Sequence, residues 1–327
     1  MFEHILVPLD ESVLAELVLP HVSAIARLSG ARVTVLRVLE PPRRAGFEQP
    51  TDPVEWEFVW DQAGRYLAKV CDGFAKHGVA ASAHILEGEP ATNIIAFARD
   101  SEVDLLAMTS HGRSGLAAHN LGGVCFKSIL RARTSLLLVR AFSPEAADPV
   151  ADSYAPRGYH RVLVPMDRSQ RAESALSFAV RMAESRGGAM HFMHAVRWGE
   201  VGSRVPLDDG EAMWEERFFT AGKANAESYL DRLRHDLAGA GLDISTTVLV
   251  HPDPATALSR LAQEEGSDLI AMSAHGLTGS SNRPLGSVTL NSLLYGTTSL
   301  LVIQDREPHE LEDSPTELAA RERQGHA

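Results

Sequence analysis

Two aspartates stand where a parallel sheet usually binds its ligand. Asp10 and Asp167 each follow a Val-Pro pair at the end of an apolar run typical of a buried strand. In open parallel sheets, ligands bind beyond the carboxyl ends of the strands. A carboxylate there could accept hydrogen bonds from ribose hydroxyls or help to hold a divalent cation such as Mg²⁺. The simpler alternative is that each aspartate only caps the helix that follows.

Two loops rich in small residues, 109–123 and 273–287, follow later strands. Small residues let backbone amides approach a ligand closely, and a glycine pair at a helix start leaves N–H groups that favour an anion. The pattern predicts a phosphate cradle with the carboxylate opposite. Alternatively, the glycines only shape the loops.

Other catalytic motifs are absent from the sequence. It contains no G-x-x-x-x-G-K-[ST], no G-x-G-x-x-G after a strand and no nucleophile elbow. His111 and His275 have no second His or Cys nearby, so we expect them to brace their loops rather than bind a metal. The sequence therefore favours a binding protein over an enzyme.

Internal duplication indicates the architecture. His4–Ser12 matches Arg161–Ser169 with five identities in nine, and Asp104–Gly115 matches Asp268–Gly279 with seven in twelve. The offset grows from 157 to 164, so the second copy carries seven extra residues between its first and third strands. A repeat of this length is a whole domain.

Each copy alternates strands and helices. In the first, strands are expected at 4–9, 32–39, 79–86, 103–109 and 135–140, with helices at 12–30, 55–76, 91–100 and 123–132. This order predicts βαβ units and a parallel sheet, hence two doubly wound α/β domains. We assign domain 1 to 1–141, a linker to 142–158, domain 2 to 159–304 and a charged, mobile tail to 305–327.

Composition and hydropathy indicate which classes of partner are disfavoured and where in the cell the protein is expected. The net charge of -12 disfavours nucleic acid. No stretch reaches the ~18 apolar residues of a membrane helix, and the N-terminus lacks a leader pattern, so we expect a cytoplasmic protein.

Cys71 and Cys125 are expected to be buried free thiols. The aromatic residues at the start of each long helix are expected to form a packed face or domain interface rather than a ligand box: Trp56, Phe58, Trp60, Trp214, Phe218 and Phe219.

The combined motifs resemble the universal stress protein family. They are V-P-x-D-x-S, A-M-[ST]-x-H-G, nine residues, G-[GS]-V and a closing S-L-L-x-[VI], and they occur twice. The resemblance implies a five-stranded parallel sheet of order 3-2-1-4-5, paired through its last strand. It also implies an ATP-binding branch with G-x-x-G, nine residues, then G-[ST].

The resemblance implies ATP-contacting residues in both copies. Those of the second copy are Asp167, Ala195, Ser273, Gly276, Gly286 and Ser287, and those of the first are Asp10, Val38, Thr109, Gly112, Gly122 and Gly123. The aspartates would face the ribose, and the backbone of Val38 or Ala195 the adenine. Arg113 and Arg283 lie within the nine-residue spacers, and we add them as phosphate-binding candidates.

Both copies depart from the ATP-binding pattern. Ser273 and Thr109 replace its first glycine, although either hydroxyl can donate a hydrogen bond, and Gly123 replaces the final hydroxyl residue. The second domain is therefore the better ATP candidate, with or without Mg²⁺.

The leading hypothesis is a nucleotide-responsive stress regulator whose two domains pair within the chain and which also forms a homodimer. The alternative is an interaction module with decayed pockets and an unknown protein partner. The weakest is a slow ATPase.

Overall fold

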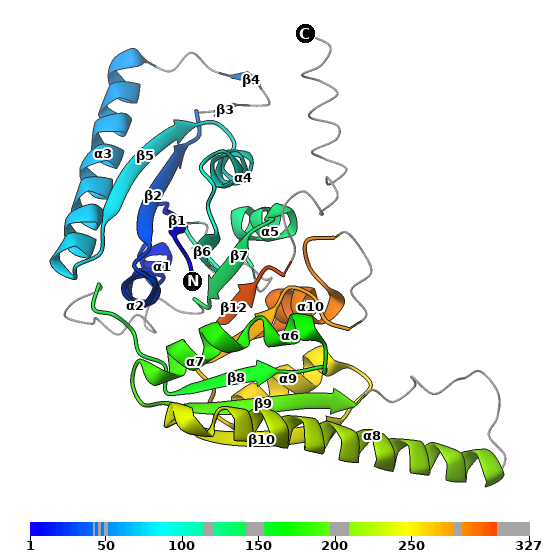
Figure 1. Cartoon of the computed structure of the whole chain (residues 1–327). Coiled ribbons are helices and arrows are strands. Elements are labelled where there is room, and N and C mark those ends of the chain that lie inside the picture. Colours follow the sequence, from blue (N-terminus) through cyan, green and yellow to red (C-terminus); the bar gives the residue numbers. More distant parts are fainter. Residues whose placement is uncertain are drawn as a thin grey trace.

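The computed structural model describes residues 1–41, 43–44, 47–48, 52–113, 121–141, 154–196, 209–277 and 283–305, with side chains described in all of these except 43–48 and 209–219. Figure 1 shows two α/β halves joined edge to edge, with helices on both faces of the strands. No helix among these residues is long and apolar enough to cross a membrane.

The first domain follows the expected order of elements. Its strands are β1 (His4–Pro8), β2 (Arg32–Leu39), β5 (Ala81–Glu87), β6 (Leu105–Thr109) and β7 (Ser135–Val139). Its helices are α1 (Val13–Glu16), α2 (Leu19–Ser29), α3 (Pro53–Lys76), α4 (Pro90–Asp100) and α5 (Gly123–Arg131). A two-stranded ribbon, β3 (Arg43–Arg44) with β4 (Phe47–Glu48), lies between β2 and α3.

The second domain repeats this order. Its strands are β8 (Arg161–Pro165), β9 (Ala189–Val196), β10 (Asp243–Val250), β11 (Leu269–Ser273) and β12 (Leu300–Ile303). Its helices are α6 (Gln170–Glu173), α7 (Leu176–Glu184), α8 (Asp209–Asp236), the short 3-10 helix η2 (Ala238–Ala240), α9 (Pro254–Glu264) and α10 (Ser287–Tyr295). The extra residues of this copy lie partly in α8, which has 28 residues where α3 has 24.

The strand order confirms the predicted fold. The sheet runs β10-β9-β8-β11-β12-β7-β6-β1-β2-β5, so each half has the order 3-2-1-4-5 of a doubly wound sheet. All pairs within a half are parallel. This arrangement brings the ends of β1 and β6, and those of β8 and β11, side by side.

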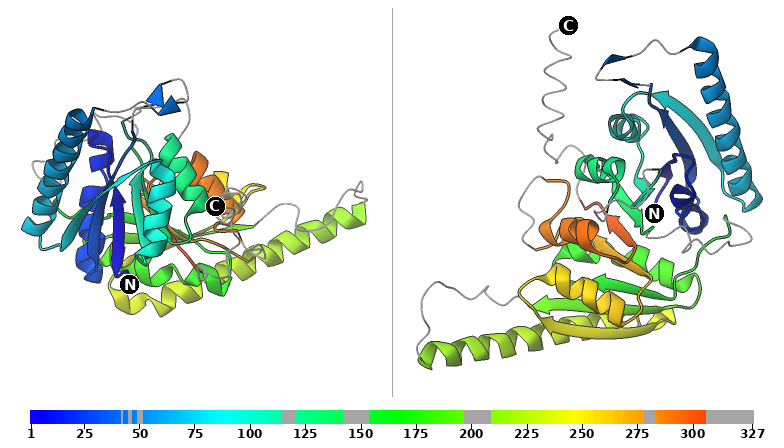
Figure 2. Two further views of the ribbon diagram at one scale, coloured as in Figure 1. Left: turned by 90° about the horizontal axis from the view of Figure 1, so that it is seen from above. Right: turned by 180° about the vertical axis from the view of Figure 1, so that it is seen from behind.

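The halves join through their last strands within one chain, as predicted. β7 and β12 pair antiparallel, with Leu137 opposite Leu301. Arg140, just beyond β7, donates from one terminal nitrogen to the carbonyls of Ser292 (2.9 Å) and Leu293 (2.8 Å) near the end of α10. Burial lowers the pKa of Arg140 to about 10. The two domains therefore form one ten-stranded sheet (Figure 2).

The sheet is buried on both faces. Ile5 and Val7 belong to one hydrophobic cluster, while Leu6 and Leu36 belong to the other, because successive strand side chains point to opposite sides. Both clusters include residues of both domains. The continuous apolar runs seen in the sequence are the consequence of this two-sided burial.

The predicted first helix is in fact two. The backbone N–H of Leu17 bonds to Leu14, a tight three-residue step, and Pro20 in the first turn of α2 lacks the N–H that would continue the ladder. The second copy breaks at Ser174, which bonds back to Arg171. Since no proline stands there, the break is a property of the fold rather than of one residue.

The end of the predicted linker packs on the first domain. Tyr154 meets the ring of Phe74 edge-on at 5.7 Å, and the N–H of Arg157 bonds to the carbonyl of Pro20. Tyr159 is fully buried, with its hydroxyl 2.7 Å from Nδ1 of His21. Residues 154–158 thus help to fix the second domain to the first, while 142–153 lie outside the described residues.

Candidate functional site

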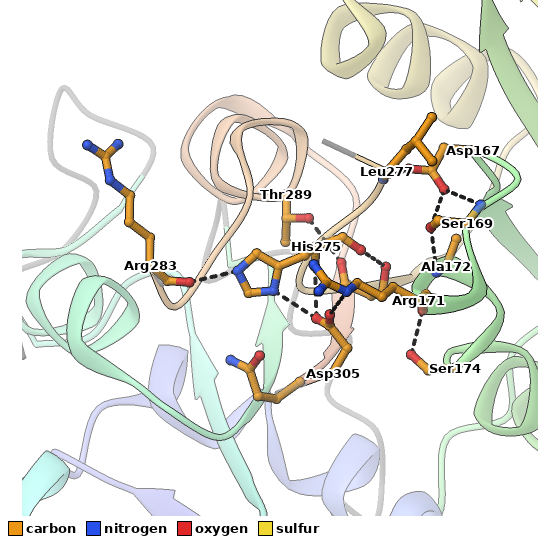
Figure 3. A network of polar contacts seen from close by, with 12 residues as sticks. Asp167, Ser169, Arg171, Ala172, Ser174, His275, Leu277, Arg283, Thr289 and Asp305 are labelled. Atoms are coloured by element: carbon orange, nitrogen blue, oxygen red, sulfur yellow. Dashed lines mark hydrogen bonds and ion pairs between the residues drawn. The ribbon is translucent and has the colours of Figure 1, made fainter. Parts of the chain in front are cut away.

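In the second domain, Asp167 joins two loops at the carboxyl end of the sheet. Its Oδ1 accepts hydrogen bonds from the N–H (3.0 Å) and hydroxyl (2.6 Å) of Ser169, whose hydroxyl in turn caps α6. Its Oδ2 accepts from the N–H of Leu277 at 2.6 Å, in the loop after β11 (Figure 3). The N-cap of α6 is Ser169 rather than Asp167, and Asp167 links this capping serine to the loop after β11.

We call this set of hydrogen bonds, from the aspartate to its serine and to the loop after the fourth strand of the domain, the aspartate bracket. The first domain has the same bracket. Asp10 accepts from the N–H (3.0 Å) and hydroxyl (2.6 Å) of Ser12 and from the N–H of Arg113 (2.5 Å). A Cβ at Gly112 or Gly276 would collide with the carboxylate of Asp10 or Asp167, respectively. Glycine is therefore required there by close approach.

A cavity of about 430 Å³ opens beside the second-domain bracket. Its wall includes every residue that the sequence predicted for this domain: Asp167, Ala195, Ser273, Gly276, Arg283, Gly286 and Ser287. They come from four separate segments, which meet only because β8, β9 and β11 end at the same edge. Their contact with a nucleotide stays a prediction.

The first-domain cavity is larger, about 610 Å³. It is lined by all seven residues predicted there: Asp10, Val38, Thr109, Gly112, Arg113, Gly122 and Gly123. The carbonyl of Val38 accepts a hydrogen bond from Arg37 at 3.1 Å. The role of these residues toward a ligand likewise stays a prediction.

Both cavities contain a helix N-terminus. Gly286 and Gly122 are the N-caps of α10 and α5, and neither helix has a side-chain cap. Each cap glycine donates its own N–H to the preceding loop, to Ala274 at 2.8 Å and to Ser110 at 2.7 Å. The amides of the following turn, with the helix dipole, are the groups suited to an anion.

The hydroxyls that replace the first glycine are used within the loops. Ser273 donates to the carbonyl of His275 at 2.5 Å, and Thr109 to that of His111 at 2.7 Å. We expected these hydroxyls to be able to donate to phosphate. In this structure each hydroxyl proton is bonded within the turn.

His275 braces the second loop, as predicted. Its Nδ1 lies 2.8 Å from Oδ1 of Asp305 and its Nε2 lies 2.7 Å from the carbonyl of Arg283 (Figure 3). These contacts tie the imidazole ring to Asp305 after β12 and to the loop that precedes α10. In the first domain, Nδ1 of His111 faces the carbonyl of Ala141 at 3.1 Å instead.

Asp305 corrects the predicted start of the tail. Its side chain is only 3% exposed and receives the backbone N–H of His275 at 3.0 Å, while Arg171 lies 3.5 Å away. The residue is therefore anchored in the second domain. The remainder of the predicted tail, 306–327, lies outside the described residues.

Several residues that line the pockets were not identified from the sequence. Arg168 lines the second cavity, and Arg37 and Trp56 line the first. Trp56, which we expected in a packed face, lines the first cavity, and its indole N–H donates to Glu87 at 2.8 Å. Phe58 is 62% exposed. The side chains of Trp214, Phe218 and Phe219 lie outside the described residues.

The other groups with possible chemical roles are the two cysteines and any cluster of metal-binding side chains. Burial raises the pKa of Cys125, in the first cavity wall, to about 12, whereas Cys71 is only half-buried rather than buried as predicted. Within the described part of the chain, no cluster of three or more His, Cys, Asp or Glu side chains could hold a metal ion.

Comparison with known proteins agrees with the duplicated fold. Universal stress protein MJ0577 of Methanocaldococcus jannaschii is 28% identical over 155 residues, which cover 45% of this chain and 95% of the relative. A universal stress protein structure from Archaeoglobus fulgidus aligns with 93% of this chain and 98% of its own, at 18% identity and a TM-score of 0.60.

A universal stress protein solved in complex with cAMP aligns with 46% of this chain and 100% of its own, at 22% identity, but its TM-score of 0.34 is too low to support an argument. The profile of the Universal stress protein family matches residues 1–140 and 158–304, so both halves are covered. The chain therefore belongs to the universal stress protein family, of which it carries two domains in tandem.

Proposed function

We propose that this protein binds ATP in the cavity of its second domain and acts as a nucleotide-responsive regulator. The observation that carries the proposal is the convergence of all seven predicted residues on one 430 Å³ cavity that contains the α10 N-terminus. A cavity of this size lies within the usual range for a small-molecule site.

The cations of this cavity support an anionic ligand. Arg168 and Arg283 line it, and neither contacts a carboxylate among the described residues. Asp167 already accepts three hydrogen bonds, which leaves its carboxylate little capacity for further donors such as a ribose hydroxyl. The α10 amides and the two guanidiniums would therefore provide most of the binding energy through the phosphates. Any Mg²⁺ would enter with the ATP.

The test is isothermal titration with ATP, with and without Mg²⁺, on the full chain and on Gly286→Asp. Aspartate is a favoured N-cap, and its Cβ would lie 3.2 Å from the carbonyl oxygen of Ala274, so the helix should persist after a small shift while the added charge repels phosphate. Gly239→Asp is the matched control, because Gly239 is exposed in the same domain with nothing near its side. We expect affinity to fall about tenfold or more for the cap variant only.

Equal ATP affinity in both variants would contradict the proposal. If Gly286→Asp proved unstable, Arg168→Gln is the second variant, and it should weaken ATP about fivefold through one lost charge. No ATP binding by the wild-type chain at millimolar concentration would favour the interaction-module alternative. The exposed Val124, Phe126 and Leu130 on α5 offer that alternative a surface.

Two further expectations remain predictions. A homodimer would have to use a surface other than the last strands, because β7 and β12 already pair within the chain. The cytoplasmic location is likewise untested.

A further inference from the structure

The two domains carry opposite charges at one equivalent position beside their pockets. Glu11 and Arg168 each stand between the bracket aspartate and its serine, both with left-handed backbone, φ 68° and 67°. Glu11 lies 3.2 Å from Nε of Arg37 and 3.4 Å from a terminal nitrogen of Arg113, the two arginines that line the first cavity. Both arginines in the described lining of that cavity are therefore paired with Glu11.

The rest of the first cavity strengthens this difference. Its described lining holds three carboxylates, Asp10, Glu40 and Glu55, against those two arginines. The described lining of the second cavity holds one carboxylate, Asp167, against Arg168 and Arg283. A polyphosphate would be repelled in the first cavity and attracted in the second.

An aromatic wall adds a second difference. Trp56 lines the first cavity, and its indole N–H is fixed by Glu87 at 2.8 Å, a carboxylate that Trp60 shares at 3.0 Å. With its N–H already bonded, Trp56 offers the ligand an apolar ring surface suited to stacking on a base. The described lining of the second cavity contains no Phe, Tyr or Trp.

We propose that the first pocket takes an uncharged nucleoside in preference to ATP, with its base against Trp56. Glu40 and Glu55 in its wall can accept hydrogen bonds from ribose hydroxyls, whereas Asp10 already accepts three hydrogen bonds within the protein. The 610 Å³ cavity has room for a base and a sugar. The chain then holds two ligands of different charge. This inference shares with the proposed function only the assumption that the pockets of this fold hold nucleotide-like molecules.

The experiment titrates adenosine and ATP separately into the full chain carrying Gly286→Asp, in which the second pocket is impaired for phosphate. We expect one equivalent of adenosine to bind, and ATP to bind at least about fivefold more weakly. Adding Trp56→Leu should weaken adenosine about tenfold. Phe58→Leu, two residues along α3 and 62% exposed, is the matched control and should leave adenosine binding as it was.

Charge substitutions at the equivalent positions Glu11 and Arg168 test whether these side chains cause the difference in ligand preference between the pockets. Glu11→Gln releases Arg37 and Arg113 and should raise the affinity of the first pocket for ATP about fivefold, and by more than it changes adenosine binding. Arg168→Gln should lower ATP affinity in the second pocket by a similar factor.

The outcomes separate the two proposals. Adenosine binding that depends on Trp56, in a chain that never binds ATP, upholds this inference while the proposed function fails. Adenosine that does not bind, or that binds regardless of Trp56, overturns the inference whatever ATP does in the second domain. First-pocket ATP affinity equal to or above that of adenosine also overturns it.

Discussion

Gly276→Ala tests whether the aspartate bracket holds the pocket loops together. The added methyl would collide with Oδ2 of Asp167, the atom that accepts the N–H of Leu277. The backbone at Gly276 does not have positive φ, so the collision is the only strain. Losing one charge-assisted hydrogen bond costs about 2 kcal/mol. The smaller entropy of the unfolded alanine chain returns up to ~1 kcal/mol, so the net loss is about 1 kcal/mol.

Urea unfolding followed by circular dichroism measures this change. Gly64→Ala is the control, because Gly64 lies inside α3 with nothing within 4 Å of an added Cβ. Alanine should stabilise that helix by about 0.5–1 kcal/mol, so the two variants should differ in sign. Gly112→Ala should behave as Gly276→Ala does. If Gly276→Ala were as stable as Gly64→Ala, the bracket would not be what holds these loops.

Three further predictions concern buried groups. Because burial raises the pKa of Cys125 to about 12, a disulfide reagent at pH 8 should modify at most Cys71 in the native chain and both thiols in guanidinium. Burial lowers the pKa of His21 from 6.5 to about 3, so an unfolded chain binds a proton that the native chain refuses. Stability should then fall by up to about 1.4 kcal/mol per pH unit from pH 6.5 toward 3, a slope that His21→Gln should reduce in urea titrations. Arg140→Met should cost about 2–4 kcal/mol, against less than ~0.5 for exposed Arg99→Met; equal costs would refute a bonding role for Arg140 at the domain interface.

The sequence predicted the sheet well because burial on both faces leaves a simple signal. The runs at 4–9 and 135–140 are mostly apolar, and the strands found there lie within those ranges. The break between α1 and α2 was not predicted, because Leu14, Leu17 and Val18 keep a helical spacing across it.

The site was predictable where it depends on backbone and not where it depends on side-chain partners. Glycines and aspartates at strand ends mark a pocket from sequence alone, and they meet around each cavity. That Ser273 donates to its own loop, or that Glu11 binds Arg37, depends on distances no spacing rule provides. The charge reversal between Glu11 and Arg168 was visible in the duplicated motif, but its meaning required the ion pairs.

The backbone at these two positions argues that their side chains have a role. A non-glycine residue held at φ near +68° costs about 1 kcal/mol, and glycine would avoid that cost. The duplicated motif keeps the aspartate and serine on either side in both copies, because the bracket needs them for its hydrogen bonds. The residue between them makes no bracket contact through its side chain, yet it is charged in both copies, with opposite sign. The position of Glu11 and Arg168 has a strained backbone and a charged side chain that takes no part in the bracket. A substitution there can alter the ligand preference of one domain while the fold of that domain stays the same.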